Sequence, residues 1–432
     1  MTPRQAAEAA TAAILADYTG GGHRGLVVDS PPGAGKTTLV VATAMRLAEA
    51  GRDLMVVAQT NEQVDDLVDR LAGKAPGVSV GRLHKEGFQP PERVTRHSNV
   101  TLHNKVDKVQ HCQVVVATAD KWAYVSGRTW PWAIVDEAYQ MRSDKLLAVA
   151  PLFADGHTLF VGDPGQLDPF SVVDSERWTG LAWDPMQSAV AVTQRLNDLA
   201  VHRLPVSWRL PATAAPVIAD AFYPASPFVS GTAHGERRLS LSPAAARDPH
   251  DAALEEAASS GWALHELPPR HTVRTDPETA AACAALARRV LERGTTAHDE
   301  YGFRPVTPDR VAVGCAHNDQ VAAVRQAGVP DGVTVDTANR LQGREYDVTI
   351  VWHPLSGRRD ATAFHLESGR LCVLASRHRH ACLVVARAGI ADLLDNHPSS
   401  LRVQLNVPVK FPDGWAANQA ILAHLARHRV PG

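Results

Sequence analysis

Residues 27–41, VVDSPPGAGKTTLVV, join an apolar run to a Pro/Gly turn and then to a helical pattern. Backbone N–H groups in such a turn, together with a helix N-terminus, favour anion binding. Lys36 would reach the β- and γ-phosphates of an NTP, and the Thr37 hydroxyl would ligate Mg²⁺. Ser30 replaces the first glycine of the usual GxxxxGK[ST] pattern, a position that only begins the turn. We therefore expect NTP binding, rather than a coincidental glycine-rich turn, by Pro32, Gly33, Ala34, Gly35, Lys36, Thr37 and Thr38.

Two later segments carry polar groups that suit hydrolysis. WAIVDEA places Asp136 and Glu137 directly after an apolar run, where Asp136 would hold Mg²⁺ through water and Glu137 would activate the attacking water. FVGDPGQLDP presents Gln166, suitably placed to sense the γ-phosphate. The alternatives are solvated loop acids and a simple turn.

Arginines in the second half of the chain could complete such a site. Arg209 in VSWRLP and Arg377 in LASRHRH each lie beside an expected strand or helix end. The planar guanidinium binds phosphate bidentately and can stabilise charge on a transferring phosphoryl group. In an arginine-rich chain a single arginine is by default a surface residue, so only the order of the motifs favours these two.

The pattern of elements predicts two consecutive α/β units. Val/Ile-rich strands alternate with helices, as in a parallel sheet buried on both faces. We expect the units to be residues 1–198 and 199–432, and we interpret 75–111 as a short insertion that interrupts the rhythm. Strands of the first unit are expected around GLVVDS, DLMVVAQT, CQVVVATAD, PWAIVDEA and HTLFVGDPG.

Composition limits the class of protein. The 432 residues carry a formal net charge of −2, which argues against nucleic-acid binding by bulk positive charge but allows a local basic groove. The five cysteines form no CxxC pair. A metal site at Cys112 and the nearby histidines is less favoured than a solvated loop. No apolar run is long enough to cross a bilayer, and the first residues lack a signal-peptide pattern, so a cytoplasmic protein is expected.

The order of these motifs resembles the superfamily 1 helicases, most closely the branch with the nonsense-mediated-decay RNA helicase and the Dna2-type helicases. TPRQAAEAA, SPPGAGKTT, VVAQTNEQVDDLVDRL, VVVATADKW, VDEAYQ, VGDPGQLDP, SWRLPATAAPVIADAFYP, TANRLQGREYD and GRLCVLASRHRH follow one another as the family's motifs do. The resemblance implies tandem RecA-like P-loop domains with an NTP site in the cleft between them. Ser207, Cys372 and Ser376 depart from the family's usual residues.

The resemblance also implies roles for single residues. Gln5 would recognise adenine, Trp208 would stack on the base, Gly343 would approach phosphate and Glu345 would bind ribose. Arg209 and Arg377 would be arginine fingers, with Arg379 as an auxiliary. Contacts to a nucleic-acid strand would come from Thr60, Asn61, Thr118, Thr337 and Asn339.

The expected function is an ATP- and Mg²⁺-dependent translocase or helicase that steps along single-stranded DNA or RNA, in the 5′ to 3′ direction of the branch. The alternatives are an ATP-gated clamp or remodelling ATPase with little unwinding, and a P-loop enzyme unrelated to nucleic acid. We expect a monomer that lacks a large duplex-splitting insertion, so that a protein partner would supply the wedge. Only 75–111 and 170–200 could form one in the chain itself. Trp122, Trp130 and Trp132 are interpreted as packing residues rather than a base-stacking wedge.

Overall fold

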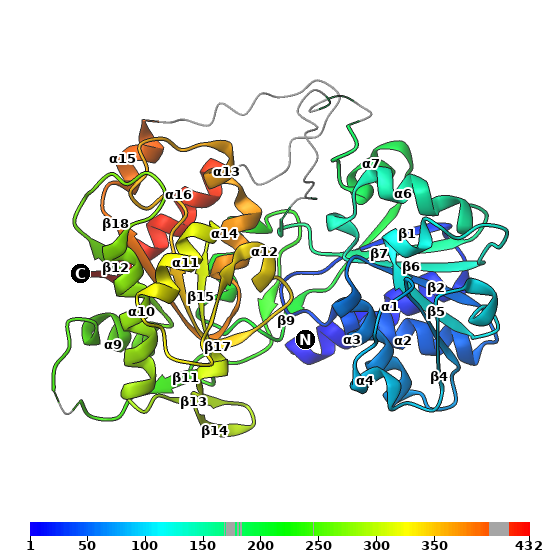
Figure 1. Ribbon diagram of the computed structural model, residues 1–432, viewed down its shortest axis with the longest axis horizontal. Helices are drawn as coiled ribbons and strands as arrows, with labels where there is room; N and C mark the ends of the chain where they lie inside the picture. The colour runs from blue at the N-terminus through cyan, green and yellow to red at the C-terminus, as the bar shows by residue number, and fades with distance from the viewer. Residues whose placement is uncertain (168, 170–177, 179–180, 182–183, 245, 397–413) are drawn as a thin grey trace.

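The computed structural model describes residues 1–432 except 168, 170–177, 179–180, 182–183, 245 and 397–413. Two parallel sheets, each with helices on both faces, lie side by side (Figure 1). The α/β class with parallel sheets is thereby confirmed. No helix in the described ranges is long and apolar enough to span a membrane.

The first sheet has eight parallel strands in the order β4-β3-β5-β2-β6-β7-β1-β8. Its central strands are runs of buried aliphatic residues, as expected where helices cover both faces. The strands are β1 Gly25–Asp29, β2 Leu54–Ala58, β3 Val80–Leu83, β4 Val100–His103, β5 Val114–Thr118, β6 Trp132–Asp136, β7 His157–Gly162 and β8 Ala200–Arg203.

Helices cover this sheet because alternate strand residues face opposite sides. Leu26 and Val28 pack with α1, α2 and α3, whereas Val27 packs on the other face near α5 and α7. The helices are α1 Pro3–Gly20, α2 Lys36–Glu49, α3 Asn61–Lys74, α4 Glu92–Thr95, α5 Ala119–Trp122, α6 Ser143–Val149 and α7 Ala189–Leu196.

The second sheet has six parallel strands in the order β16-β15-β17-β18-β12-β19. These strands are β12 Trp262–Leu267, β15 Val311–Cys315, β16 Thr334–Thr337, β17 Tyr346–Trp352, β18 His378–Arg387 and β19 Arg429–Pro431. Smaller sheets pair β9 Val206–Ser207 with β10 Val229–Ser230, and β13 Thr296–Asp299 with β11 Arg238–Ser240 and β14 Gly302–Pro305.

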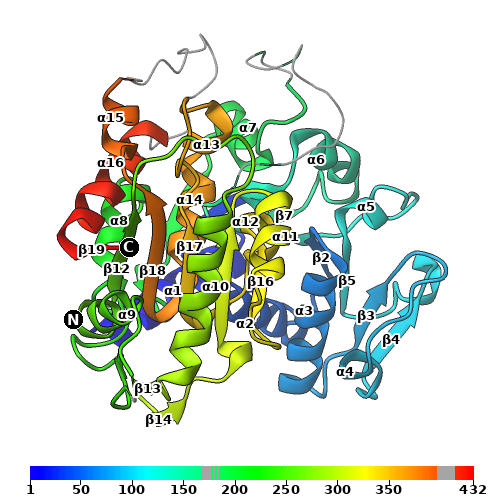
Figure 2. The ribbon, with the colours of Figure 1, turned by 60° about the vertical axis from the view of Figure 1, so that its left-hand side comes forward.

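Two groups of helices enclose the second sheet, and α10 crosses in front of it in Figure 2. The helices α9 Asp251–Ser260, α10 Pro277–Glu292 and α11 Asn318–Gln326 pack on one face. The opposite face carries α8 Ala215–Phe222, α12 Ala338–Leu341, α14 Ser368–Ala375 and α16 Gly414–Leu425. The short helices α13 Ala363–Leu366 and α15 Ile390–Asp395 follow β17 and β18 in the chain.

Residues 75–111 do not interrupt the sheet, so that expectation is wrong. They supply β3 and β4, which extend the first sheet at one edge. Arg82 lies in β3, fully buried, and its Nε donates to Asp65 Oδ1 at 2.9 Å. In a strand of only four residues, one arginine is enough to hide the apolar pattern of a buried strand. The partner that allows Arg82 to be buried, Asp65, lies outside the strand, so the local sequence does not reveal it.

The expected boundary at 198/199 is also misplaced. Strand β8 begins at Ala200 and pairs with β1, so it belongs to the first sheet. Leu204 N–H then donates to Asp29 O at 2.9 Å, which keeps the chain against β1 beyond the strand. A four-residue edge strand that is half exposed resembles a linker in sequence, since it lacks the continuous apolar run of the central strands.

The three tryptophans are core residues, as expected. Trp122, Trp130 and Trp132 are all less than a tenth exposed. Trp122 Nε1 donates to Val56 O at 3.0 Å, and its ring meets Trp130 edge-on at 5.0 Å. The expected wedge region 170–200 lies partly outside the described residues, and its described end forms α7.

Candidate functional site

The loop between β1 and α2 has the backbone of a phosphate cradle. Gly33 and Gly35 adopt left-handed conformations, with φ of 71° and 91°. A Cβ at Gly33 would lie 2.3 Å from Arg209 Cβ, so glycine is required for this close approach. Ser30, in contrast, is not among the residues with positive φ, and its N–H donates to Gly162 O at 2.9 Å. The missing first glycine therefore causes no backbone strain.

Lys36 and the carboxylates after β6 converge beside this loop. Lys36 Nζ lies 3.4 Å from Glu137 Oε1, and Gln140 Nε2 donates to Glu137 Oε2 at 3.0 Å. Glu137 has φ of 50°, the one non-glycine with positive φ in the described part of the chain. Strain of this kind is typical of functional turns.

Asp136 has the character of a ligand for a cation. Burial, and next the negative charge of Glu137, raise the pKa of Asp136 to about 7. Its Oδ1 is buried and has no hydrogen-bond partner. Thr37 lies in the first turn of α2, and Mg²⁺ commonly takes one or two protein oxygens and keeps several waters. These residues fit a hydrated Mg²⁺. The described residues contain no group of three or more His, Cys, Asp or Glu able to hold a metal.

The loop after β7 links the two sheets. Gln342 Nε2, after α12, donates to Gln166 Oε1 at 2.7 Å. Asp163 accepts hydrogen bonds from Tyr223 Oη at 2.6 Å and from Gly165 N–H at 3.0 Å. The pKa of Asp163 is raised, chiefly by burial. The sequence motif contained Tyr223, but only the structure indicates its role of holding this loop.

One of the two candidate finger arginines, Arg209, lies against the phosphate loop, and the other, Arg377, lies in the second half of the chain near Arg209. Trp208 N–H donates to Gly33 O at 2.9 Å, which places Arg209 against the loop. Arg377 is fully buried; its Nε donates to Val373 O at 3.0 Å, whereas Nη1 has no partner. Burial, and then repulsion by Arg209, lower the pKa of Arg377 to about 10. A buried guanidinium with an unsatisfied donor is suited to receive an anion.

Glu345 binds arginines in the structure. Its two carboxylate oxygens lie 3.3 Å from Arg209 Nε and 3.2 Å from Arg379 Nη1, and these cations hold its pKa below the usual range despite burial. Gly343, with φ of 80°, has open space where a Cβ would stand. The structure thus places Glu345 as a bridge between the two arginines, and the expected ribose contact stays a prediction.

A cavity of about 560 Å³ lies between α1 and α2 and reaches Trp208. Most of its lining is apolar, with Ala12, Leu15 and Leu39 among the side chains. Gln5, expected at the base, does not line it. Instead Thr2 N–H donates to Gln5 Oε1 at 2.9 Å, and Gln5 N–H donates back to the Thr2 hydroxyl. The Thr-x-x-Gln spacing thus forms a capping box at the start of α1.

The expected strand contacts lie at the carboxyl ends of parallel strands. Thr60 follows β2 and Thr118 ends the neighbouring strand β5, and each hydroxyl accepts a backbone N–H at the start of a helix. Because a cap uses only the oxygen, each O–H remains able to donate to phosphate. Asn61 accepts from Arg82 at 3.0 Å. Thr337 ends β16, and the exposed Asn339 begins the next turn.

Comparisons with known proteins agree with the motifs. A family model described as an AAA domain matches residues 7–197. The mouse (Mus musculus) DNA replication ATP-dependent helicase/nuclease DNA2 is 28% identical over 188 residues, covering 41% of this chain and 17% of that protein. The Arabidopsis thaliana helicase/nuclease JHS1 is 22% identical over 348 residues, covering 74% and 24%. An arterivirus nonstructural protein 10 (helicase) structure superposes with a TM-score of 0.43 at 15% identity, covering 89% of this chain and 61% of that chain.

The chain spans less than a fifth of the length of the mouse and chicken (Gallus gallus) DNA2 proteins that it matches. The yeast (Saccharomyces cerevisiae) DNA2 match, 27% identical, covers 35% of this chain and 10% of that protein. The family-model match, residues 7–197, includes the phosphate loop. These matches confirm the resemblance that the motifs indicated, to the Dna2-type branch of the superfamily 1 helicases.

Proposed function

We propose that this protein is an ATP-driven motor that hydrolyses ATP·Mg²⁺ between its two sheets and steps along single-stranded nucleic acid. The observation that carries the proposal is the position of Arg209 and Arg377. Arg209 lies against the phosphate loop, where Gly33 permits the close contact, and Arg377 lies near enough to Arg209 for the charge of Arg209 to lower the Arg377 pKa. A site built from both halves of the chain couples hydrolysis to their relative movement.

On the loop side, Gly33, Gly35 and Lys36 would cradle the phosphates. Thr37 and Asp136 would hold Mg²⁺, which neutralises charge on the phosphate oxygens. Glu137 would take a proton from the attacking water, with Gln140 holding the carboxylate in place. Gln166 would report the state of the γ-phosphate to the second half of the chain through Gln342.

On the opposite side, Arg209 and Arg377 would stabilise the charge that builds on the transferring phosphoryl group. Fingers of this kind are typically worth about 10³–10⁵ in rate. Arg377 has an unused buried donor for this purpose. Glu345 keeps Arg209 and Arg379 oriented before nucleotide arrives.

The strand would be held at the carboxyl edges of both sheets. Thr60, Asn61 and Thr118 would contact its backbone from the first sheet, and Thr337 and Asn339 from the second. Contacts of this type read no sequence. We propose a monomer, 5′ to 3′ movement as in the branch, and a wedge supplied by a partner protein for splitting duplexes.

The direct test is ATP hydrolysis measured in parallel with single-stranded DNA, single-stranded RNA and no nucleic acid, at one stated salt concentration. The proposal expects strong stimulation by at least one strand. Hydrolysis that no strand stimulates would contradict it and favour a P-loop enzyme unrelated to nucleic acid.

An ATP-gated clamp is the second candidate, because close contacts join the halves of the chain beside the nucleotide site. Gly33 of the phosphate loop packs on Arg209, and Gln166 in the loop after β7 accepts a hydrogen bond from Gln342. Displacement of streptavidin from a biotinylated strand end separates the two. A motor displaces it from one end in an ATP-dependent manner, whereas a clamp shows stimulated hydrolysis without displacement.

A further inference from the structure

A second cavity lies far along the chain from the phosphate loop, at the carboxyl ends of three adjacent strands. The loops after β12, β17 and β18 surround about 430 Å³ of space. In parallel α/β sheets this edge is where ligands bind. The volume falls in the range of small-molecule sites, which is about 300–1,000 Å³. None of the roles assigned above uses these loops.

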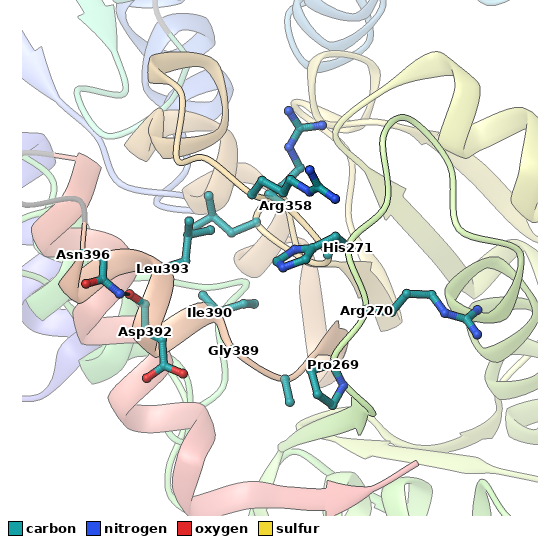
Figure 3. A pocket seen from close by; sticks show the side chains of 13 residues that line it. Pro269, Arg270, His271, Arg358, Gly389, Ile390, Asp392, Leu393 and Asn396 are labelled. Carbon is teal, nitrogen blue, oxygen red and sulfur yellow. Dashed lines mark hydrogen bonds between the residues drawn. The ribbon is translucent and has the colours of Figure 1, made fainter.

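The lining combines an apolar side with a cationic side. Leu355, Ile390 and Leu393 supply aliphatic surface, and His271, Arg358 and Arg359 supply nitrogen donors. Figure 3 shows the His271 ring turned toward the middle of the cavity, with Arg358 beside it. An apolar wall facing guanidinium groups fits a flat base with its phosphate.

The positive charge of this cavity is incompletely balanced. Asp392, the carboxylate in the lining, points away from the centre, as does Arg270, which pairs with Glu278 at 3.2 Å (Figure 3). Arg358 donates to Val273 O at 2.8 Å and lies 3.3 Å from Asp360, but its Nε is buried without a partner. Among the residues that the structure describes, Arg359 makes no ion pair or hydrogen bond through its side chain, and it is exposed. The site therefore attracts an anionic group.

The same sheet edge connects the cavity to the expected strand contacts. In the order β16-β15-β17-β18-β12, Thr337 ends the first strand and the cavity lies over the last three. With strands about 4.8 Å apart, β16 and β18 are separated by about 14 Å. Between them the exposed Phe364 stacks on His317, with ring centroids 4.7 Å apart. Arg370 Cζ lies 3.7 Å from the centroid of the same ring, so His317 and Arg370 already contact its faces, and a strand would meet the exposed edge of Phe364.

We infer that this cavity binds one nucleotide unit of the single strand, with its phosphate on Arg358 and Arg359 and its base against Leu355, Ile390 and Leu393. The inference rests on the proposed function, since the strand must first cross Thr337. It adds a second binding point on the second sheet, which would hold the strand beyond its contacts with Thr337 and Asn339. A free mononucleotide has the same chemistry, and the test separates the two sources.

The test compares Arg359→Glu with Arg247→Glu, an equal charge change at an exposed arginine of the loop before α9. Binding of short and long thymidine and uridine oligonucleotides is measured by fluorescence anisotropy over a salt series. We expect Arg359→Glu to weaken binding of long strands about tenfold and to reduce the salt slope by about one. Short strands that end before the cavity are unaffected, Arg359→Lys keeps most of the affinity, and Arg247→Glu matches the unchanged protein.

The outcomes separate this inference from the proposed function. If the unchanged protein binds long strands and Arg359→Glu weakens them no more than Arg247→Glu, the inference is overturned and the proposed function stands. If no strand binds the unchanged protein, the proposed function is wrong, and the inference, which rests on it, is wrong as well. If thymidine monophosphate binding depends on Arg359 while long-strand affinity does not, the ligand is a free nucleotide and the strand anchor is overturned. Photocrosslinking of a long iodouridine strand to residues 353–359 or 388–396 is the supporting result.

Discussion

At the scale of single residues, the chemistry depends on charges that are buried before any ligand arrives. Asp136 keeps an oxygen without a hydrogen-bond partner beside Glu137 and Lys36, and Arg377 keeps a free donor near Arg209. Under the proposed function, each group would gain a partner when a phosphate and a cation enter. The residue types were predictable from the sequence because the motif spacing is regular. The capping role of Gln5 and the pairing of Glu345 with two arginines were not, since both depend on contacts that the motif order does not contain.

Glu137→Gln separates binding from chemistry. The amide keeps the size of the side chain and its contact with Gln140, but it cannot take a proton from water. We expect ATP affinity to change less than about threefold and turnover to fall about 10³-fold or more. Fluorescent-nucleotide binding and phosphate release measure the two quantities. Lys36→Ala is the contrasting variant, because it loses binding as well; turnover above a tenth of normal in Glu137→Gln would contradict the assigned role.

Gln5→Ala separates the two roles considered for this side chain, capping of α1 and recognition of adenine. The side chain caps α1 and does not line the cavity beside Trp208. We expect the melting temperature to fall by a few degrees, from loss of about 1 kcal/mol of capping free energy, with little change in the KM for ATP relative to GTP. Thermal unfolding and hydrolysis of both nucleotides check this. A selective rise of the KM for ATP would restore base recognition by Gln5.

At the scale of elements, strong periodicity identified the central strands and the longer helices. The errors lie at the edges of the first sheet, where β3, β4 and β8 are short and partly polar. Whether such segments form strands depends on pairing with residues far away in the sequence, and not on their local pattern. Arg82 illustrates this, because its charge is tolerated in β3 only through Asp65 on α3.

Arg82→Met should destabilise the first sheet strongly, because Asp65 is left buried without its partner. Breaking one side of a buried ion pair typically costs about 3–5 kcal/mol. Urea unfolding measures the change. The double variant Asp65→Asn/Arg82→Met is the control and is expected to recover much of the loss. A single variant within about 1 kcal/mol of the unchanged protein would show that the pair does not hold β3 in place.

The end of β17 makes stability depend on pH. Burial lowers the pKa of His353 to about 4 from an ordinary value of 6.5, so the unfolded chain binds its proton first on acidification. Stability is full above pH 6.5 and is lost as the pH falls from 6.5 toward 4, by at most about 3 kcal/mol from this residue. We expect His353→Asn to show a shallower loss in urea unfolding at these two pH values. An identical pH dependence would contradict this assignment.

At the scale of the whole molecule, several contacts between the two halves lie at the ends of the neighbouring strands β1 and β7. Gln166 meets Gln342, Asp163 meets Tyr223, and Asp29 accepts from Ser226 at 2.8 Å. Under the proposed function, nucleotide binding at this place would change how the halves meet, and the carboxyl edges that would hold the strand would move with them. The sequence predicted two α/β units from the alternation of strands and helices, but not which side chains join the units, since these partners lie up to 197 positions apart.

The measurement that tests the central claim most directly is ATP turnover by Arg377→Ala with a saturating single strand. Arg429→Ala, an exposed arginine on the distant strand β19, is the matched control. The two-sided site predicts that Arg377→Ala loses about 10³-fold or more in turnover while strand affinity stays nearly intact and Arg429→Ala behaves normally. Near-normal turnover by Arg377→Ala would contradict a nucleotide site completed by the second half of the chain.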